Sequence, residues 1–114
     1  MFVLHLQAVH VKDTWGAHCD KLIFMSTKED TNLGAIKLDV EDGRIGLWAK
    51  VKLACKHIFL NYFDDYDWFM KSDDDTFVII ENLKAMLSEY DTNEPIHFGH
   101  HSKVLGVSFD AINL

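Results

Sequence analysis

Three consecutive aspartates, Asp73–Asp75, carry the clearest chemical potential in this sequence. They follow the apolar residues 68–70 and precede the apolar run 77–80, so we expect them where a buried strand ends and a helix begins. Three neighbouring carboxylates repel one another, and this repulsion is costly at a strand end unless a positive group binds there. A divalent cation held by oxygen ligands is the simplest candidate, and it suggests a phosphate-bearing substrate.

The spacing of the outer two aspartates fits one metal ion. Asp73 and Asp75 are two residues apart, so in an extended backbone their side chains point to the same side. Mg²⁺ and Mn²⁺ prefer carboxylate, phosphate and water oxygens, and two carboxylates leave further coordination positions for a diphosphate. Asp74 then points the other way, toward a sugar hydroxyl or a basic side chain.

The structural alternative is an acidic turn that caps the following helix. Aspartate at a helix start accepts hydrogen bonds from backbone N–H groups that have no partner within the helix. Other carboxylate motifs fit worse. A calcium-binding EF-hand loop needs a glycine that is absent here, and an Asp-x-Asp-x-Thr phosphatase motif starting at Asp73 fails because its last position is Phe77.

The composition narrows the class of protein. The 114 residues suit one domain or part of one. The 18 acidic residues outnumber the 11 basic ones and give a net charge of -7, which argues against a nucleic-acid-binding protein with a basic surface. Cys19 and Cys55 are too few for a disulfide scaffold and fit no zinc spacing. Their disulfide state stays open.

No membrane anchor is expected within this chain. No uninterrupted apolar run approaches the roughly 20 residues of a membrane span. Residues 1–6 lack the charged start and small-residue cleavage site of a signal peptide. The sequence therefore predicts neither a signal segment nor a transmembrane segment.

The sequence predicts alternating strands and helices. Short apolar runs with polar flanks indicate strands, and a 3.6-residue period indicates helices. The predicted elements are a helix at 10–16, strands at 21–26 and 35–40, a helix at 47–62, a strand at 68–72, a helix at 78–90 and a strand at 96–99. This order indicates an α/β domain, in which ligands bind beyond the carboxyl ends of the strands.

The predicted helix at 47–62 has the clearest amphipathic period. Its expected buried face contains four apolar residues, Leu47, Val51, Ala54 and Ile58, whereas its lysines, including Lys50, lie mostly elsewhere. The three tryptophans of the chain, Trp15, Trp48 and Trp68, are expected in the core.

Residues 67–79, Asp-Trp-Phe-Met-Lys-Ser-Asp-Asp-Asp-Thr-Phe-Val-Ile, resemble the Asp-Trp-Phe-x-Lys-x-Asp-Asp-Asp-Thr-(Tyr/Phe)-Val segment of core 1 β1,3-galactosyltransferases. Further blocks resemble this family in its own order: residues 10–16, 19–26, 41–44, 47–50, 81–91 and 94–99. The similarity covers residues 9–99, and residues 100–114 diverge from it. The resemblance implies a GT-A-like (Rossmann-like) nucleotide-sugar-binding domain, here a single partial domain over residues 1–114.

The resemblance also implies an activity. Members of this family transfer galactose from UDP-galactose, with inversion and with Mn²⁺, to the 3-OH of GalNAc on Ser or Thr of glycoproteins, at the lumenal side of the Golgi membrane. Asp73 and Asp75 take the place of the metal residues, and Asp74 lies close to the donor. Lys50 and Arg44 also match family segments. The alternatives for Lys50 are contact with a diphosphate or a solvated helix face, and those for Arg44 are a donor-side role, a structural ion pair or a plain surface charge. The segments expected to hold the catalytic base lie beyond Leu114, so no residue is assigned as the base.

A second hypothesis keeps the fold but not the catalysis. Residues 1–8 resemble neither the family's membrane anchor nor its first strand, and the acceptor segment has no counterpart in this sequence. On that reading the chain is a truncated, non-catalytic fragment that acts at most as a binding or interaction module, because an incomplete sheet exposes strand edges and apolar faces.

Overall fold

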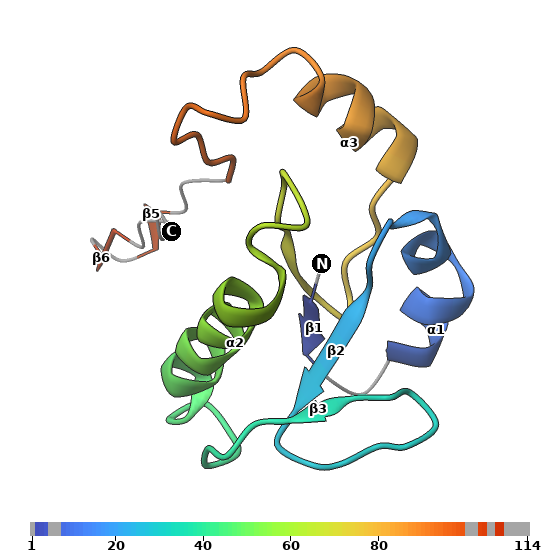
Figure 1. Ribbon diagram of the computed structural model, residues 1–114. Coiled ribbons are helices and arrows are strands. Elements are labelled where there is room, and N and C mark those ends of the chain that lie inside the picture. Colours follow the sequence, from blue (N-terminus) through green and yellow to red (C-terminus); the bar gives the residue numbers. More distant parts are fainter. Residues whose placement is uncertain (1, 5–7, 100–102, 105–106, 109–114) are drawn as a thin grey trace.

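The chain forms a parallel sheet between two layers of helix (Figure 1). The computed structural model describes residues 2–4, 8–99, 103–104 and 107–108. In chain order the elements are β1 (Phe2–Leu4), α1 (Ala8–Asp13), the 3₁₀ helix η1 (Trp15–His18), β2 (Ile23–Ser26), β3 (Ile36–Lys37), α2 (Leu47–Tyr62), β4 (Lys71–Asp73), α3 (Ile80–Leu87), β5 (Lys103–Val104) and β6 (Val107–Ser108).

The main sheet has the strand order β3-β2-β1-β4, and every pair in it is parallel. Residue Phe2 lies opposite Ile23 on one side, and Leu4 lies opposite Asp73 on the other. Because parallel strands run the same way, their carboxyl ends meet at one edge of the sheet. The predicted mixed α/β class is confirmed. The short strands β5 and β6 pair with each other in a separate antiparallel sheet.

The strand β1 was not expected from the first eight residues of the sequence. These residues were expected to contain no counterpart of a first strand, yet Phe2–Leu4 lies in the sheet between β2 and β4. Three apolar residues are too few to show a strand period, so only their pairing with distant parts of the chain identifies the strand.

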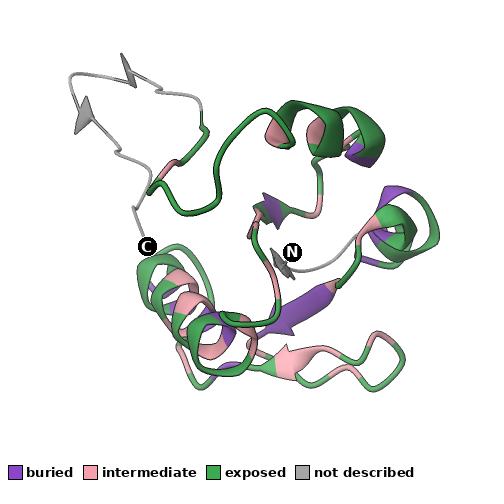
Figure 2. Ribbon diagram, turned by 45° about the horizontal axis from the view of Figure 1, so that its top comes forward, coloured by how far each residue is buried: buried purple, intermediate pink, exposed green. Residues whose placement is uncertain are grey.

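Strand β2 is buried on both faces (Figure 2). Ile23 and Met25 pack with Ala54 and Ile58 of α2, whereas Phe24 packs on the other face with a second cluster that includes Trp15. A parallel strand covered on both sides reads as a continuous apolar run. This explains why the strand predicted at 21–26 is confirmed within two residues.

Helix α2 has the predicted bounds but a different buried face. Ala54 and Ile58 are buried as expected, whereas Leu47 is 51% exposed and Lys50 is only 7% exposed. The buried line therefore runs through positions 50, 54 and 58, four residues apart. Lysine can occupy such a position because its aliphatic stem packs while its ammonium group reaches a polar partner.

Two of the three tryptophans depart from the predicted core positions. Trp15 is 5% exposed, as predicted, but Trp48 is 64% exposed at the start of α2. Trp68 is half-buried, and its ring lies 6.0 Å from that of Phe98. The tryptophan on α2 is exposed because the same rotation of the helix that buries Lys50 turns position 48 outward.

Three predicted strands are shorter than expected or absent. The strand expected at 68–72 is hydrogen-bonded only as β4, because its partner β1 offers three residues. The strand expected at 35–40 pairs only at Ile36–Lys37. The strand expected at 96–99 does not form, and Phe98 instead packs its ring on Tyr90 at 4.8 Å.

The helices next to the sheet end earlier than their sequence patterns indicate. The helix predicted at 10–16 is α1 followed by η1, and a Cβ at Gly16 would lie 2.6 Å from the Val11 carbonyl oxygen, so the tight junction needs glycine. The helix predicted at 78–90 is α3, which is shorter at both ends. Among the residues that the structure describes, no helix is long and apolar enough to cross a membrane.

Replacing Met25 by alanine should lower the free energy of unfolding by about 2–5 kcal/mol, because it leaves a cavity between β2 and α2. Met25 has 0% of its surface exposed. Urea denaturation measures the change. Leu60→Ala is the control, since Leu60 is 67% exposed and its loss should change stability by about 0.5 kcal/mol or less. Equal effects of the two substitutions would contradict this packing.

Candidate metal and nucleotide edge

The three aspartates lie at the carboxyl end of β4, the position that the sequence predicts for them. Asp73 is the last residue of the strand, and the next two residues form a turn. The Asp73 and Asp75 side chains are exposed, and Asp74 is half-buried. Two carboxylates therefore face solvent at the edge of the sheet where α/β proteins bind ligands.

The backbone around Asp75 differs from the extended chain that the spacing argument assumed. The Thr76 N–H donates to the Asp73 carbonyl at 3.3 Å and closes a turn, so Asp73 and Asp75 do not share one face of a strand. The chain must reverse here to reach α3. Two residues of chain separate their Cα atoms by at most about 7 Å, a distance at which both carboxylates can contact one cation.

The alternative of an acidic turn agrees with the structure in part: the aspartates do form a turn, but none of them is the N-cap residue of the next helix. Helix α3 begins at Ile80, its N-cap residue is Ile79, and no side chain caps it. Residues 76–79 separate the aspartates from the helix start.

Lysine supplies the positive charge beside Asp73. The Lys71 Nζ lies 2.6 Å from Asp73 Oδ1, and the two side chains are 37% and 58% exposed. An exposed ion pair contributes only about 0–1 kcal/mol, so a divalent cation can displace the ammonium group at small cost. The aspartates thus offer hard oxygen ligands of the kind that Mn²⁺ and Mg²⁺ prefer.

The number of protein carboxylates at this turn suits a metal ion that also binds water or phosphate oxygens. Within the described ranges, no group of three or more His, Cys, Asp and Glu side chains is placed to hold a metal ion. Asp73 and Asp75 alone supply two carboxylates. Mg²⁺ and related ions are commonly held by one or two carboxylates together with substrate phosphates, so this donor set fits such an ion.

A second set of polar residues lies near the carboxyl end of β2. Lys50 is buried from α2, and its Nζ is 3.5 Å from Asp42 Oδ1. The Gly43 N–H, donating at 3.0 Å, is the largest cause that lowers the pKa of Asp42, and Lys50 lowers it further. Thr27, directly after β2, also contributes to that lowering.

The Thr27 hydroxyl is an unusual feature of this edge. Its Oγ1 is buried and makes no hydrogen bond of normal geometry in the described part of the chain, although it lies close enough to Asp42 to affect its pKa. Buried polar atoms normally have a partner. The sequence analysis did not single out Thr27, and no spacing rule could have found it.

The two polar groups lie along one edge of the sheet. β2 and β4 are separated by β1 alone, and the register puts Asp73 level with Met25, two residues before Thr27. With adjacent strands about 4.8 Å apart and a rise of about 3.3 Å per residue, the Thr27 and Asp73 Cα atoms are about 12 Å apart. Arg44 lies in the exposed turn before α2, after Gly43, whose φ of 93° needs glycine. The structure therefore brings Lys50 to this edge and leaves Arg44 exposed beside it.

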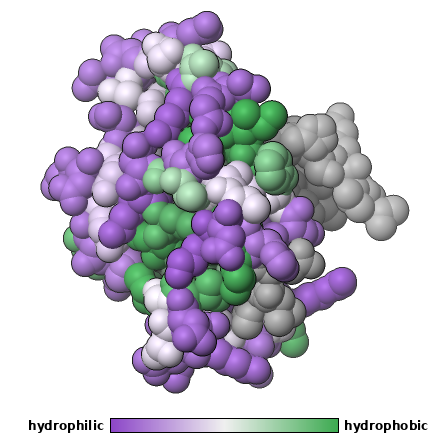
Figure 3. Space-filling view, turned by 90° about the vertical axis from the view of Figure 1, so that its right-hand side faces the viewer, coloured by the Kyte–Doolittle hydropathy of each residue, from purple (hydrophilic) through white to green (hydrophobic). Residues whose placement is uncertain are grey.

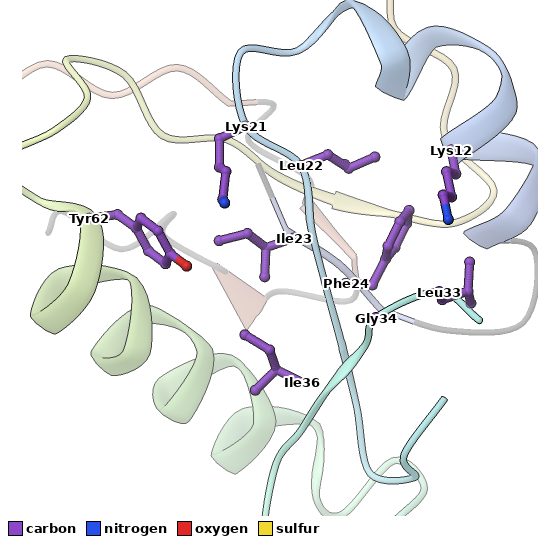
Figure 4. Close-up of a pocket in the computed structure, with 9 residues that line it drawn as sticks. All are labelled: Lys12, Lys21, Leu22, Ile23, Phe24, Leu33, Gly34, Ile36 and Tyr62. Atoms are coloured by element: carbon purple, nitrogen blue, oxygen red, sulfur yellow. The ribbon is translucent and has the colours of Figure 1, made fainter. Parts of the chain in front are cut away.

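The aspartates line neither of two cavities found in the described part of the chain. One cavity of about 280 Å³ lies beside the start of β2 (Figure 4). Its two lysines already have partners: Lys12 Nζ donates to the Asn32 carbonyl at 3.2 Å, and Lys21 Nζ lies 5.4 Å from the centre of the Tyr62 ring. This cavity is therefore not a ready phosphate site.

The two cysteines are free thiols. Cys19 packs with the cluster under α1, and Cys55 packs with the cluster under α2, so the sheet lies between them. Burial raises the pKa of both thiols. A Cys19–Cys55 disulfide is therefore absent from this structure.

Comparison with known proteins shows which family this chain resembles in sequence. The Fringe-like family model matches residues 5–108. The chain is 41% identical over 100 residues to glycoprotein-N-acetylgalactosamine 3-beta-galactosyltransferase 1 of Xenopus laevis, covering 88% of this chain and 28% of that protein. It is 30% identical to beta-1,3-glucosyltransferase of Mus musculus, covering 78% of this chain and 18% of the relative.

A third relative is more distant. Chondroitin sulfate synthase 3 of Homo sapiens is 25% identical, covering 82% of this chain and 12% of that protein. The matches thus cover most of this chain, whereas the chain spans 28% or less of the length of these three relatives.

Lowering the pH should weaken the fold, with the loss concentrated below about pH 4.5. Asp42, Glu81 and Asp91 have pKa values below their usual 3.8 or 4.5, so the folded state binds fewer protons than the unfolded state there. Their contribution is complete above the usual pKa and is lost as pH falls through the folded pKa. Urea denaturation from pH 7 to 3 measures this loss.

The matched control is Asp42→Asn, which removes one of the three carboxylates. This variant should lose less unfolding free energy between pH 5 and pH 3 than the parent chain, because one proton-linked contribution is gone. A loss of the same size in both proteins would show that Asp42 is not held in its ionised form by Gly43 and Lys50.

Proposed function

The chain belongs to the Fringe-like family, and on that basis we propose that it forms the donor-binding part of a glycosyltransferase. The observation that carries the proposal is the run of three aspartates at the carboxyl end of β4, in a parallel sheet covered on both faces. Two of the named relatives are a galactosyltransferase and a glucosyltransferase. A GT-A-like nucleotide-sugar fold accounts for both.

The donor in this proposal is UDP-galactose and the acceptor is GalNAc on a glycoprotein. The 41% identity to the Xenopus galactosyltransferase and the Asp-Trp-Phe segment before the aspartates support this choice over other sugars. The reaction is inverting transfer to the 3-OH. The place of action is the lumenal side of the Golgi membrane.

The proposed metal residues are Asp73 and Asp75, and the ion is Mn²⁺. Bound there, it would supply positive charge that offsets the charge developing on the leaving diphosphate. Lys71 balances the charge of Asp73 in the absence of the ion. Asp74, between these two residues, lies at the same edge of the sheet, which we call the donor edge: the carboxyl ends of β2 and β4 with the turns that follow them.

Thr27, Asp42 and Lys50, near the carboxyl end of β2, form the other end of the donor edge. Lys50 keeps a buried positive charge on Asp42, and the buried Thr27 hydroxyl lies close to the same carboxylate. Arg44, in the neighbouring exposed turn, can swing its guanidinium group toward a diphosphate, which it suits as a two-pronged donor. The separation of about 12 Å between the Thr27 and Asp73 Cα atoms suits a ligand the size of a nucleoside diphosphate.

A second candidate function is a non-catalytic binding module. It is favoured by the outward face of α2 and the turn before it, where Ile45 is 91% exposed, Trp48 is 64% exposed and Leu60 is 67% exposed. Large exposed apolar side chains on a helix and on the turn before it are candidates for an interaction surface. A galactose-transfer assay on a GalNAc-bearing peptide separates the two candidates, because turnover by the 114-residue chain excludes the second.

Replacing Asp73 and Asp75 together by asparagine should weaken Mn²⁺-dependent UDP binding by more than about tenfold, since loss of even an indirect metal partner costs that much. Titration calorimetry with Mn²⁺ and UDP measures the affinity. The control is Asp64→Asn with Asp65→Asn, which makes the same charge change in another exposed turn. Unchanged affinity in the Asp73/Asp75 variant would refute the metal assignment.

A further inference from the structure

The outward side of α2 is a surface that the donor edge does not use. α2 covers the face of the sheet opposite to α1, and its outward side faces away from the rest of the molecule (Figure 1). Residues three or four positions apart lie on one side of a helix, and five such residues are exposed here: Trp48, Lys52, Lys56, Phe59 and Phe63. We call these five residues the α2 outer stripe.

The apolar part of the α2 outer stripe is aromatic and already ordered. Phe59 is 56% exposed and Phe63 is 54% exposed, yet their ring centres lie only 4.8 Å apart. Two rings that pack on each other have little side-chain freedom left to lose when a partner covers them. On the face that carries α1 and α3, by comparison, hydrophobic side chains are interspersed with hydrophilic ones (Figure 3).

The charge changes sign at the end of α2. Residues 43–63 contain four basic residues and no acidic one, whereas three aspartates, Asp64, Asp65 and Asp67, follow directly in an exposed turn. In the described part of the chain, neither Lys52, Lys56 nor any of these aspartates forms an ion pair. The helix and its turn therefore present positive and negative charges side by side, all without an ionic partner.

A second copy of the same helix complements this pattern when it lies antiparallel. In a two-fold contact, each residue meets its partner residue twice, once in each direction. Lys56 and Asp64 are eight residues apart, or about 12 Å along the helix. With the two-fold axis midway between them, Lys56 of one copy faces Asp64 of the other, and Phe59 and Phe63 lie on either side of the axis. A parallel arrangement would instead place like charges together.

Two other occupants fit the surface less well. Helices that lie on a lipid surface carry their lysines on a polar face, away from the buried apolar face, whereas Lys52 and Lys56 lie in the middle of the stripe, between Trp48 and the two phenylalanines. An extended peptide needs a groove, and the stripe lines neither of the two cavities in the described part of the chain.

We infer that two copies of this chain associate through the α2 outer stripe, in an antiparallel two-fold contact. The Phe59–Phe63 pairs of both copies pack at the centre, and Lys56 of each copy pairs with Asp64 of the other. A single helix of 16 residues offers less area than a standard interface, so we expect a dissociation constant in roughly the micromolar range. The contact uses no residue of the donor edge and does not rest on the proposed function.

Sedimentation velocity over a concentration series, with charge-reversal variants, tests the inference. The parent chain should shift from monomer to dimer as its concentration rises. Lys52→Glu with Lys56→Glu, and separately Asp64→Lys with Asp65→Lys, should each weaken self-association at least about tenfold, because like charges then face each other. An equal mixture of the two variants should form a heterodimer, since every lysine again faces a carboxylate.

The controls separate this contact from general charge and apolar effects. Lys28→Glu with Lys37→Glu makes the same charge change at exposed positions outside α2 and should associate like the parent chain. Phe59→Ala should weaken the dimer, whereas Phe77→Ala, at a position that is 72% exposed outside α2, should not.

Three results would overturn the inference: a parent chain that stays monomeric at every concentration, charge-reversal variants that associate like the parent, or a mixture of these variants that forms no heterodimer. Binding of the monomer to anionic lipid vesicles in place of dimerisation would also overturn it. The donor proposal fails separately, because Asp73→Asn with Asp75→Asn should dimerise like the parent, and both charge-reversal variants should keep the parent's affinity for UDP with Mn²⁺.

Discussion

Parallel pairing of β1 with both β2 and β4 is the interaction on which the rest of the structure depends. The pairs Phe2–Ile23 and Leu4–Asp73 fix the register of three strands that are far apart in the sequence. This register places Asp73 and Thr27 along the same edge. Without the central strand, the aspartates and the Lys50–Asp42 pair would belong to two unconnected pieces of chain.

The helices on the two faces make this sheet stable and decide what lies at its edge. Burial of Met25 against α2 and of Phe24 against Trp15 covers β2 from both sides. The same packing turns α2 so that Lys50 points inward, where its charge meets Asp42. An acidic chain with a net charge of -7 thereby keeps a positive charge close to its anionic edge, and Lys71 provides another on Asp73. Both positive charges are thus held next to carboxylates.

The sequence predicts the features that depend on local pattern. The bounds of α2 follow from a 16-residue amphipathic period, and β2 follows from a short apolar run between polar flanks. The position of the aspartates at a strand end also follows, because the apolar residues before them and the turn after them are both local. The metal role of Asp73 and Asp75 stays a prediction.

Features that depend on tertiary contacts could not be predicted. The strand β1 is defined by partners in distant parts of the chain, and η1 meets α3 through a His18–Glu81 pair separated by 63 residues. The burial of Lys50 and the exposure of Trp48 depend on how α2 is rotated against the sheet, which a helical period cannot fix to within one residue. The turn at Asp74–Asp75 depends on the direction in which α3 lies.

The most direct test of the central claim is paramagnetic broadening of backbone amide NMR signals by Mn²⁺ at less than one equivalent, recorded with UDP present. The account predicts that the signals of Asp73, Asp74 and Asp75 broaden first, followed by that of Thr27 across the same edge. Broadening that starts at the other acidic turn, Asp64–Asp67, or that spreads evenly over the exposed carboxylates, would contradict the claim that this edge binds a metal and a diphosphate.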